Sequence, residues 1–418
     1  MKHVKRLLVA AGMIGIFGVA ILIVRTERGL TRGERLIGRG QWQAARTALG
    51  RYLWLHPRSD QARMLMAEAL VKDDRLAEAN TAREAIDFLA AIEDRSPLGA
   101  EARLREARLV FFLQFQPARA ERLFHRAIEL NPRSFEARYM LWKLLDMTGK
   151  SLLAESLVWE TYDMAPESER PRILREWYLS QFFPSRANPL FDLLSGFSSG
   201  ATLRIENPEF NRILRYMESE PDAPVNHAAF ARLYQNEGDH HEALKLLDKV
   251  IADPRALENA YCVSTVVHSL FELGDFEGAK RYFDQWPEPH DGYEYWKWRA
   301  MLADEVDHDY PRALAAYDRA LSVWPGQADW RTQFRKANCL AKQGDKRYAA
   351  DVRVVAKKVE LLLEIDVHRD IRAALRDLDD PRQLDKVRDF YAGIGRNREA
   401  GEWQRVIERL DKRKGAEG

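Results

Sequence analysis

The sequence predicts an all-α protein built from stacked pairs of antiparallel helices. One observation is a repeated pattern: residues 120–132 and 313–325 both carry alanine, an aromatic residue, alanine and proline, at gaps of four, three and five residues. Residues 45–57 and 154–166 keep the same gaps with looser residue types. After residue 30, apolar residues recur every three or four positions, and no stretch sustains the alternation of a strand.

Each position of this pattern has a structural reason. A small residue lets the second helix of a pair approach the first closely, the aromatic residue four positions later faces the same side, and proline stops the helix. Five positions before the small residue stands a glycine, which can take positive φ and end the first helix. These turn glycines are Gly40, Gly149, Gly238, Gly274, Gly344 and, less regularly, Gly395. Two units carry His308-Asp309-Tyr310-Pro311 and Phe115-Gln116-Pro117 there instead.

The unit repeats at 34 residues between Pro132 and Pro166. With its glycine, alanine, aromatic, alanine and proline positions, it resembles the tetratricopeptide repeat family. The resemblance implies a right-handed superhelical solenoid whose first helices line a concave, protein-binding surface. The predicted units are 26–59, 60–97, 101–134, 135–167, 224–256, 260–290, 294–328, 330–364 and 381–414.

The pattern divides the chain into four regions. Residues 1–25 form a predicted membrane anchor, 26–167 a first array of repeats, 168–223 an irregular helical hinge, and 224–418 a second array with a C-terminal tail. The hinge segment does not fit the repeat and carries prolines and a Ser/Gly loop at 195–200. Because such a segment interrupts the stacking of neighbours, we expect two separately cooperative arrays and proteolysis first at this loop.

The N-terminus predicts a membrane helix. Leu7–Val24 is a run of 18 residues without a charge, about 27 Å long as a helix and enough for a hydrocarbon core. The alternative is a cleaved signal peptide, against which stand the length of the run and Arg25 directly after it. We expect a single-pass, bacterial-type membrane protein with most of the chain outside the cytoplasm, although arginines on both sides leave the orientation open.

The charge balance gives no argument for nucleic acid as a partner. Lys plus Arg number 65 and Asp plus Glu 64, for a net charge of +1. Cys262 and Cys339 form no metal-binding spacing and fall in apolar helical patterns, which is typical of small core residues. The tryptophans Trp177, Trp286, Trp296, Trp298, Trp330 and Trp403 lie at helical spacing, which favours core positions.

No motif of the sequence predicts catalysis, a cofactor or a metal. Adjacent side chains on a helix point about 100° apart, so His240 and His241 do not suit one ion. His368-Arg369-Asp370 spells a kinase triplet by chance, since no Gly-rich loop or DFG accompanies it. We therefore expect a protein that is not an enzyme.

A groove that binds a protein or peptide remains. The first-helix positions expected to face it are Tyr139, Lys143, Arg232, Asn236, His268, Trp298 and Asn338. The family's grip on a C-terminal carboxylate is not expected, because Phe334 stands where a lysine would precede Asn338. The predicted function is a membrane-anchored adaptor. Alternatives are an exported, soluble binding protein of cell-envelope assembly or polysaccharide export, and a spacer without a specific ligand. The sequence leaves the partner and the oligomeric state open.

Overall fold

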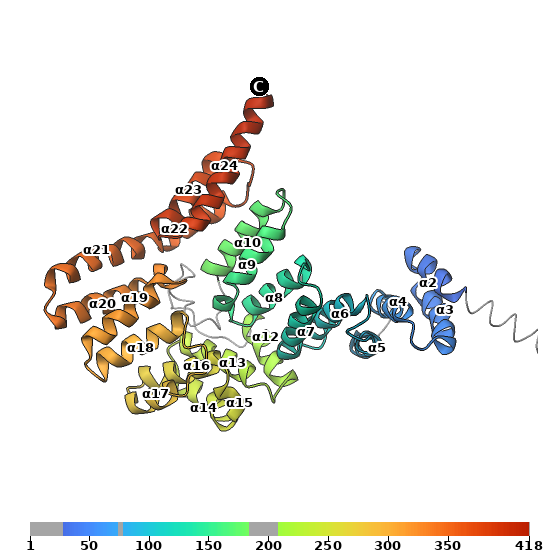
Figure 1. The fold of residues 1–418 in the computed structure, drawn as a ribbon, viewed down its shortest axis with the longest axis horizontal. Coiled ribbons are helices and arrows are strands. Elements are labelled where there is room, and N and C mark those ends of the chain that lie inside the picture. The colour runs from blue at the N-terminus through green and yellow to red at the C-terminus, as the bar shows by residue number, and fades with distance from the viewer. Residues whose placement is uncertain (1–27, 74–77, 184–207, 418) are drawn as a thin grey trace, which may run out of the picture. The chain divides into compact units, whose positions relative to one another are not determined.

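The computed structural model describes residues 28–73, 78–183 and 208–417. All regular secondary structure within these ranges is helical (Figure 1). The chain forms two compact units, Met1–Met140 and Leu141–Gly418. The first unit contains α2 (Gly29–Gly38), α3 (Trp42–Leu55), α4 (Asp60–Val71), α5 (Glu78–Ala90), α6 (Gly99–Phe112) and α7 (Pro117–Leu130). It ends within α8 (Phe135–Met147), at Met140.

The second unit begins within α8 and ends with two long helices. Its elements are η1 (Ser151–Leu153), α9 (Glu155–Met164), α10 (Arg170–Phe182), α12 (Pro208–Ser219), α13 (Pro224–Asn236), α14 (His240–Ala252), α15 (Pro254–Leu257), α16 (Ala260–Glu272), α17 (Phe276–Phe283), α18 (Tyr293–Glu305), α19 (Tyr310–Ser322), η2 (Gly326–Ala328), α20 (Trp330–Gln343), α21 (Lys346–Leu362), α22 (Ile365–Ala374), α23 (Pro381–Gly393) and α24 (Asn397–Glu417).

The nine predicted units coincide with helix pairs. The pairs are α2–α3, α4–α5, α6–α7, α8–α9, α13–α14, α16–α17, α18–α19, α20–α21 and α23–α24. Neighbouring pairs stack on one another as a solenoid requires, for example α3 on α4 and α19 on α20. The all-α fold of stacked helical hairpins is therefore confirmed.

The turn between the helices of a pair has the predicted backbone. All six turn glycines have positive φ, from 69° at Gly40 to 105° at Gly344. In three units an aspartate follows the glycine and caps the second helix; Asp239, Asp275 and Asp345 accept from the backbone N–H three residues on, at 2.9–3.1 Å. Gly-Asp is thus both the stop of one helix and the start of the next.

His308 and Phe115, which replace the turn glycine in two units, also have positive φ, at 53° and 57°. Among the described residues, these two are the non-glycine residues whose backbone has positive φ. The side chain of His308 is exposed, and its Nδ1 lies 3.2 Å from the carbonyl oxygen of Asp304. The repeat therefore keeps the turn geometry at the cost of backbone strain.

His308→Gly is expected to stabilise the second unit by about 0.5–1 kcal/mol, because relief of the left-handed strain exceeds the added entropy of the unfolded chain. The reciprocal change at the equivalent turn, Gly274→Ala, is expected to destabilise by about 1–2 kcal/mol. Thermal melts of the two variants check this. Shifts of the same sign would contradict it.

The predicted close-approach positions are buried. Ala45, Ala120, Ala154 and Ala313 are each 0% exposed, as are the aromatic partners Phe124 and Tyr317. Ala313 and Tyr317 belong to one apolar cluster with Val267, Trp298 and Met301, contributed by the successive pairs α16–α17 and α18–α19. The repeated alanines therefore mark contacts between helices, as the sequence predicts.

Ala313→Leu and Ala120→Leu are each expected to lower the free energy of unfolding by about 1–3 kcal/mol, since three added carbons overpack a site with no free volume. Ala350→Leu on α21 is the matched control, because Ala350 is exposed on its helix. Denaturant unfolding measures all three. If the control lost as much stability as Ala313→Leu, overpacking would not explain the effect.

The division into units differs from the predicted domains. The first unit ends at Met140, whereas the repeats predict a first array that continues to residue 167. The physical reason is that α9 and α10 pack against C-terminal helices: Trp177 of α10 donates to Glu399 of α24 at 3.1 Å, and Tyr162 of α9 donates to Glu402 at 2.8 Å. Residues 170–182 of the predicted hinge are thus a regular helix with a buried face.

Two predictions fall outside the described residues. The Ser/Gly loop at 195–200, with its predicted proteolytic cut, is one, and the membrane segment Leu7–Val24 is the other. Within the described ranges, no helix combines the length and the apolar character that a bilayer crossing demands.

Candidate peptide-binding pocket

The second unit contains a pocket of about 380 Å³ formed where the ends of several helix pairs meet. Residues 149–155 around η1 contribute one wall, and the start of α16 another. The connection from Trp286 to Gly292 and the first turn of α18 line the third, and Val323-Trp324 after α19 the fourth. The pocket is therefore built mainly from helix starts and from the connections between repeats. We call it the aromatic pocket.

Five aromatic side chains line the pocket. They are Tyr261, Trp286, Tyr293, Tyr295 and Trp324, and each is at most 6% exposed. Tyr293 is held by a hydrogen bond from its hydroxyl to Asp329, and Tyr295 is stacked between Phe283 and the imidazole of His290, with ring centroids 5.3 Å away on each side. Because their neighbours fix them, these rings form a rigid apolar surface.

Arg232 forms the base of the pocket. Its side chain is buried, with Nε donating to Thr265 Oγ1 at 2.7 Å and Nη2 to the carbonyl oxygen of Tyr261 at 3.1 Å. The same nitrogen lies 3.2 Å from Glu294 Oε1, and the guanidinium lies 3.6 Å from the centre of the Tyr261 ring. Burial raises the pKa of the Tyr261 phenol despite this cation. Arg232 is thus fully engaged and orients Tyr261.

The mouth of the pocket is acidic. Glu258, Glu288 and Asp291 line it, and among the described residues no lysine or arginine forms an ion pair with them. Asp291 accepts from Trp296 Nε1 at 2.7 Å, and this bond, with one from the Gly292 N–H, lowers the pKa of its carboxyl. Cations lie nearby without pairing with these carboxylates: Lys150 lines another wall of the pocket, and Arg319 also contributes to the lowered pKa of Asp291.

One donor inside the pocket has no acceptor. Trp286 is 6% exposed, and within the described part of the chain its buried Nε1–H makes no hydrogen bond. A buried donor without an acceptor is costly in a folded protein.

The structure spreads the predicted contact residues over both units. Arg232 lines the aromatic pocket, and Asn236 is half-buried one turn further along α13. His268 and Trp298 lie together, with ring centroids 5.2 Å apart. Trp298 is 3% exposed and donates to Ser264 Oγ at 3.1 Å, which places it in the core. Burial, more than the nearby Lys297, lowers the pKa of His268.

The other three predicted residues lie elsewhere. Lys143 pairs with Glu176 at 2.9 Å. Asn338 is exposed and accepts from Arg353 at 3.1 Å. Tyr139, in the first unit, stacks on Phe135 with ring centroids 6.1 Å apart. The pocket therefore collects one of the seven, and a partner contact at the others stays a prediction.

Most of the lining lies outside the first-helix faces that the repeat pattern predicts to bind a partner. Trp286-Pro287-Glu288-Pro289 and Val323-Trp324-Pro325 follow second helices, where proline marks a helix end. Aromatic residues beside these prolines are a signal that could have been noticed, because a large apolar residue in a connection needs a surface to cover it.

Comparison with known families agrees with the fold. A model of the tetratricopeptide repeat family matches residues 30–88 and 306–352, which cover α2 to most of α5 and the α19–α20 region. The chain is thus an α-helical repeat protein in which residues 30–88 and 306–352 are similar to tetratricopeptide repeats. No curated protein matches the chain significantly.

Solved structures with related helices include three that differ in coverage. The structure of pilF from Pseudomonas aeruginosa is 15% identical and covers 54% of this chain and 92% of its own, with a TM-score of 0.26. The structure of the Cut9–Hcn1 hetero-tetramer of the APC/C is 14% identical. It covers 94% of this chain and 75% of its own, with a TM-score of 0.32. The structure of the P58(IPK) TPR domain is 16% identical. It covers 93% of this chain and 99% of its own, with a TM-score of 0.27. Likeness at this level carries no information on the ligand.

Proposed function

We propose that the chain is a scaffold that holds a segment of a partner protein in the aromatic pocket. Its mixture of rigid aromatic walls and an acidic mouth is the observation that carries the proposal. Tyrosine and tryptophan offer large contact area with little loss of conformational entropy, and they dominate the energetics of protein interfaces. In this proposal the chain binds and does not catalyse.

The charge of the mouth selects the partner segment. Glu258, Glu288 and Asp291 attract lysine and arginine side chains. A carbonyl of the bound segment would accept from Trp286 Nε1. We therefore expect the bound segment to combine basic and aromatic or proline residues.

Peptide display on the purified full-length chain tests this. Selected peptides are expected to be rich in lysine, arginine and aromatic residues. Charge reversal at the mouth, Glu258→Lys with Glu288→Lys, is expected to weaken their binding at least tenfold (about 1.4 kcal/mol). Asp248→Lys with Glu277→Lys is the matched control, since both residues are exposed and outside the pocket. Equal weakening in the two double variants would refute the pocket as the binding site.

We also propose that Leu7–Val24 holds this scaffold at a membrane. The support is the uncharged run itself, long enough for a bilayer. Carbonate extraction of cell membranes is expected to leave the full chain in the pellet and to release a variant without residues 1–25. Intact-mass measurement of the native protein then separates an anchor from a cleaved signal: loss of the N-terminal segment would favour the exported, soluble alternative.

A further inference from the structure

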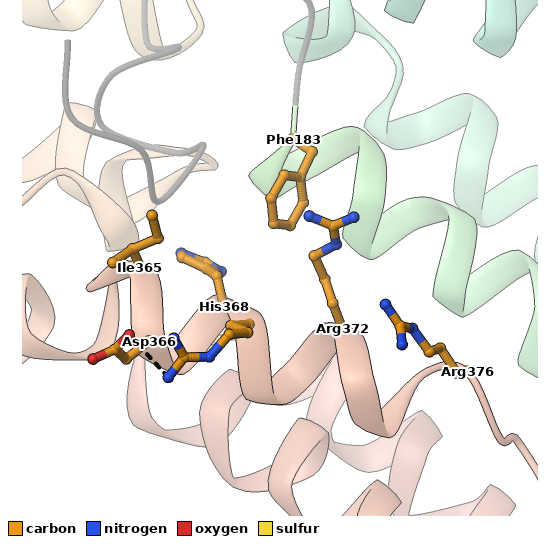
Figure 2. A pocket seen from close by; sticks show the side chains of 7 residues that line it. Phe183, Ile365, Asp366, His368, Arg372 and Arg376 are labelled. Carbon is orange, nitrogen blue, oxygen red and sulfur yellow. Dashed lines mark ion pairs between the residues drawn. The ribbon is translucent and has the colours of Figure 1, made fainter. Parts of the chain in front are cut away.

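A second pocket of the same unit, distinct from the aromatic pocket, is lined by three arginines. It has a volume of about 300 Å³ and lies between the end of α10 and the exposed side of α22. Its lining consists of Phe183, Ile365, Asp366, His368, Arg369, Arg372 and Arg376. Figure 2 shows Arg372 and Arg376 projecting side by side from α22 and the residues after it, with Phe183 above the Arg372 guanidinium. We call it the arginine pocket.

The arginines of this pocket are not equivalent. Arg369 forms an ion pair with Asp366 at 3.0 Å, which neutralises it locally. Arg372 lies over the ring of Phe183, 4.6 Å from its centre, and this contact fixes its direction. Among the described residues no carboxylate pairs with Arg372 or Arg376. Two guanidinium groups therefore face the same space with their charge unpaired.

His368 adds an oriented donor on the inner side. It is 1% exposed, and its Nδ1 lies 2.7 Å from the hydroxyl of Tyr178. In the imidazole tautomer whose Nδ1 accepts from the Tyr178 hydroxyl, the ring proton resides on Nε2. Nε2 is buried and has no hydrogen-bond partner in the described part of the chain. A buried N–H beside two unpaired guanidinium groups is a site for an anionic oxygen.

From these contacts we propose that the arginine pocket binds the carboxylate side chains of an acidic protein segment. One carboxylate accepts from His368 Nε2–H and Arg372, and Arg376 holds it or its neighbour at the rim. The exposed face of Ile365 and the ring of Phe183 offer apolar contact to the methylene groups of glutamate.

The distribution of charge around the pocket favours a protein segment over a nucleic acid. Asp366, Asp370 and Asp377 alternate with the arginines along α22 and the residues after it. A nucleic acid needs a continuous basic stripe, which these acids interrupt. Asp366 lines the pocket but is paired with Arg369, so a few carboxylates on a flexible segment can reach Arg372 and Arg376.

Fluorescence anisotropy of a fluorescein-labelled hexaglutamate peptide with the purified full-length chain tests the proposal. Binding at low ionic strength is expected to fall at least tenfold in Arg372→Gln with Arg376→Gln. His368→Phe, which keeps a ring and removes the donor, is expected to weaken binding severalfold while its circular dichroism spectrum stays helical. Arg347→Gln with Arg382→Gln is the matched control, since these exposed arginines lie outside the pocket and carry the same charge change.

The proposal is supported if the control double variant binds within twofold of the unmutated chain and the pocket variants do not. It is overturned if hexaglutamate does not bind, or if both double variants lose affinity equally. It is also overturned if a hexanucleotide binds more tightly than hexaglutamate with the same dependence on Arg372 and Arg376. The charge-reversed aromatic pocket, Glu258→Lys with Glu288→Lys, is expected to keep its hexaglutamate affinity, so the two pockets are tested independently.

Discussion

Glu399→Ala is expected to lower the free energy of unfolding of the second unit by about 3–5 kcal/mol. Glu399 is 1% exposed, and its Oε1 accepts from Trp177 Nε1 at 3.1 Å and from Gln181 Nε2 at 3.5 Å. It also pairs with the buried guanidinium of Arg396, which contacts Glu155. Alanine would leave a buried cation with one partner fewer and two buried donors without an acceptor, and this loss is the source of the large effect.

Denaturant unfolding followed by tryptophan fluorescence measures the effect, because the fully buried Trp177 and Trp403 report on these helices. Glu408→Ala on the same helix is the control. Glu408 is exposed, and among the described residues it accepts from Gln404 alone, at 3.0 Å, so a change of less than about 0.5 kcal/mol is expected. A loss at Glu399 no larger than this would show that α24 does not hold α9 and α10.

The repeats could be predicted because their signals are local. A glycine that ends a helix and an alanine five residues later act within one helix pair, so spacing alone identifies the turn and the packing face. Gly238 and Gly344 have the positive φ that this spacing predicts. The alanines five residues later, Ala243 and Ala349, are completely buried. Even His308, the wrong residue type for the turn, adopts the turn conformation, because the packing of the repeats determines the backbone.

The contact of α9 and α10 with the C-terminal helices could not be predicted in this way. Tyr178 and His368 are separated by 190 residues, and Glu155 and Arg396 by 241. Periodicity identifies the apolar face of α10 but not the helix that covers it. The sequence pattern also does not predict that a polar residue such as Gln181 is buried. Gln181 accepts from Tyr391 at 2.7 Å, and only the position of Tyr391 in the fold explains its burial.

The pockets show the same limit. Family resemblance predicts that first-helix side chains face a groove; Arg232 lines the aromatic pocket, and a partner contact there stays a prediction. It does not predict that neighbouring rings cover Trp298, which is buried against His268 and Phe271. In α22, His368 and Arg369 belong to a triplet that resembles the kinase catalytic loop, but the sequence does not support kinase chemistry. The informative spacing was that of Arg369, Arg372 and Arg376, of which the first two lie on α22 and the third in the turn just after it.

His368 is expected to make the stability of the second unit fall as pH falls below neutrality. Its ring is packed against Phe182 and Phe390, with centroids 5.2 and 5.5 Å away. Burial lowers the pKa of His368 from 6.5 to about 4. The unfolded chain therefore binds a proton between pH 6.5 and 4 that the folded chain does not. Stability is complete above the unfolded pKa and declines through this window, by about 3 kcal/mol when it has been crossed.

Urea unfolding at pH 7.5 and pH 5.0 checks this expectation in the unmutated chain and in His368→Gln. From pH 7.5 to 5.0 the unmutated chain is expected to lose about 2 kcal/mol more than the variant. Burial also lowers the pKa of His240 and His268, but both chains carry these groups and their contribution cancels in the difference. Glutamine cannot titrate, so a variant with the same pH dependence as the unmutated chain would mean that His368 is protonated as easily in the folded state as in the unfolded one.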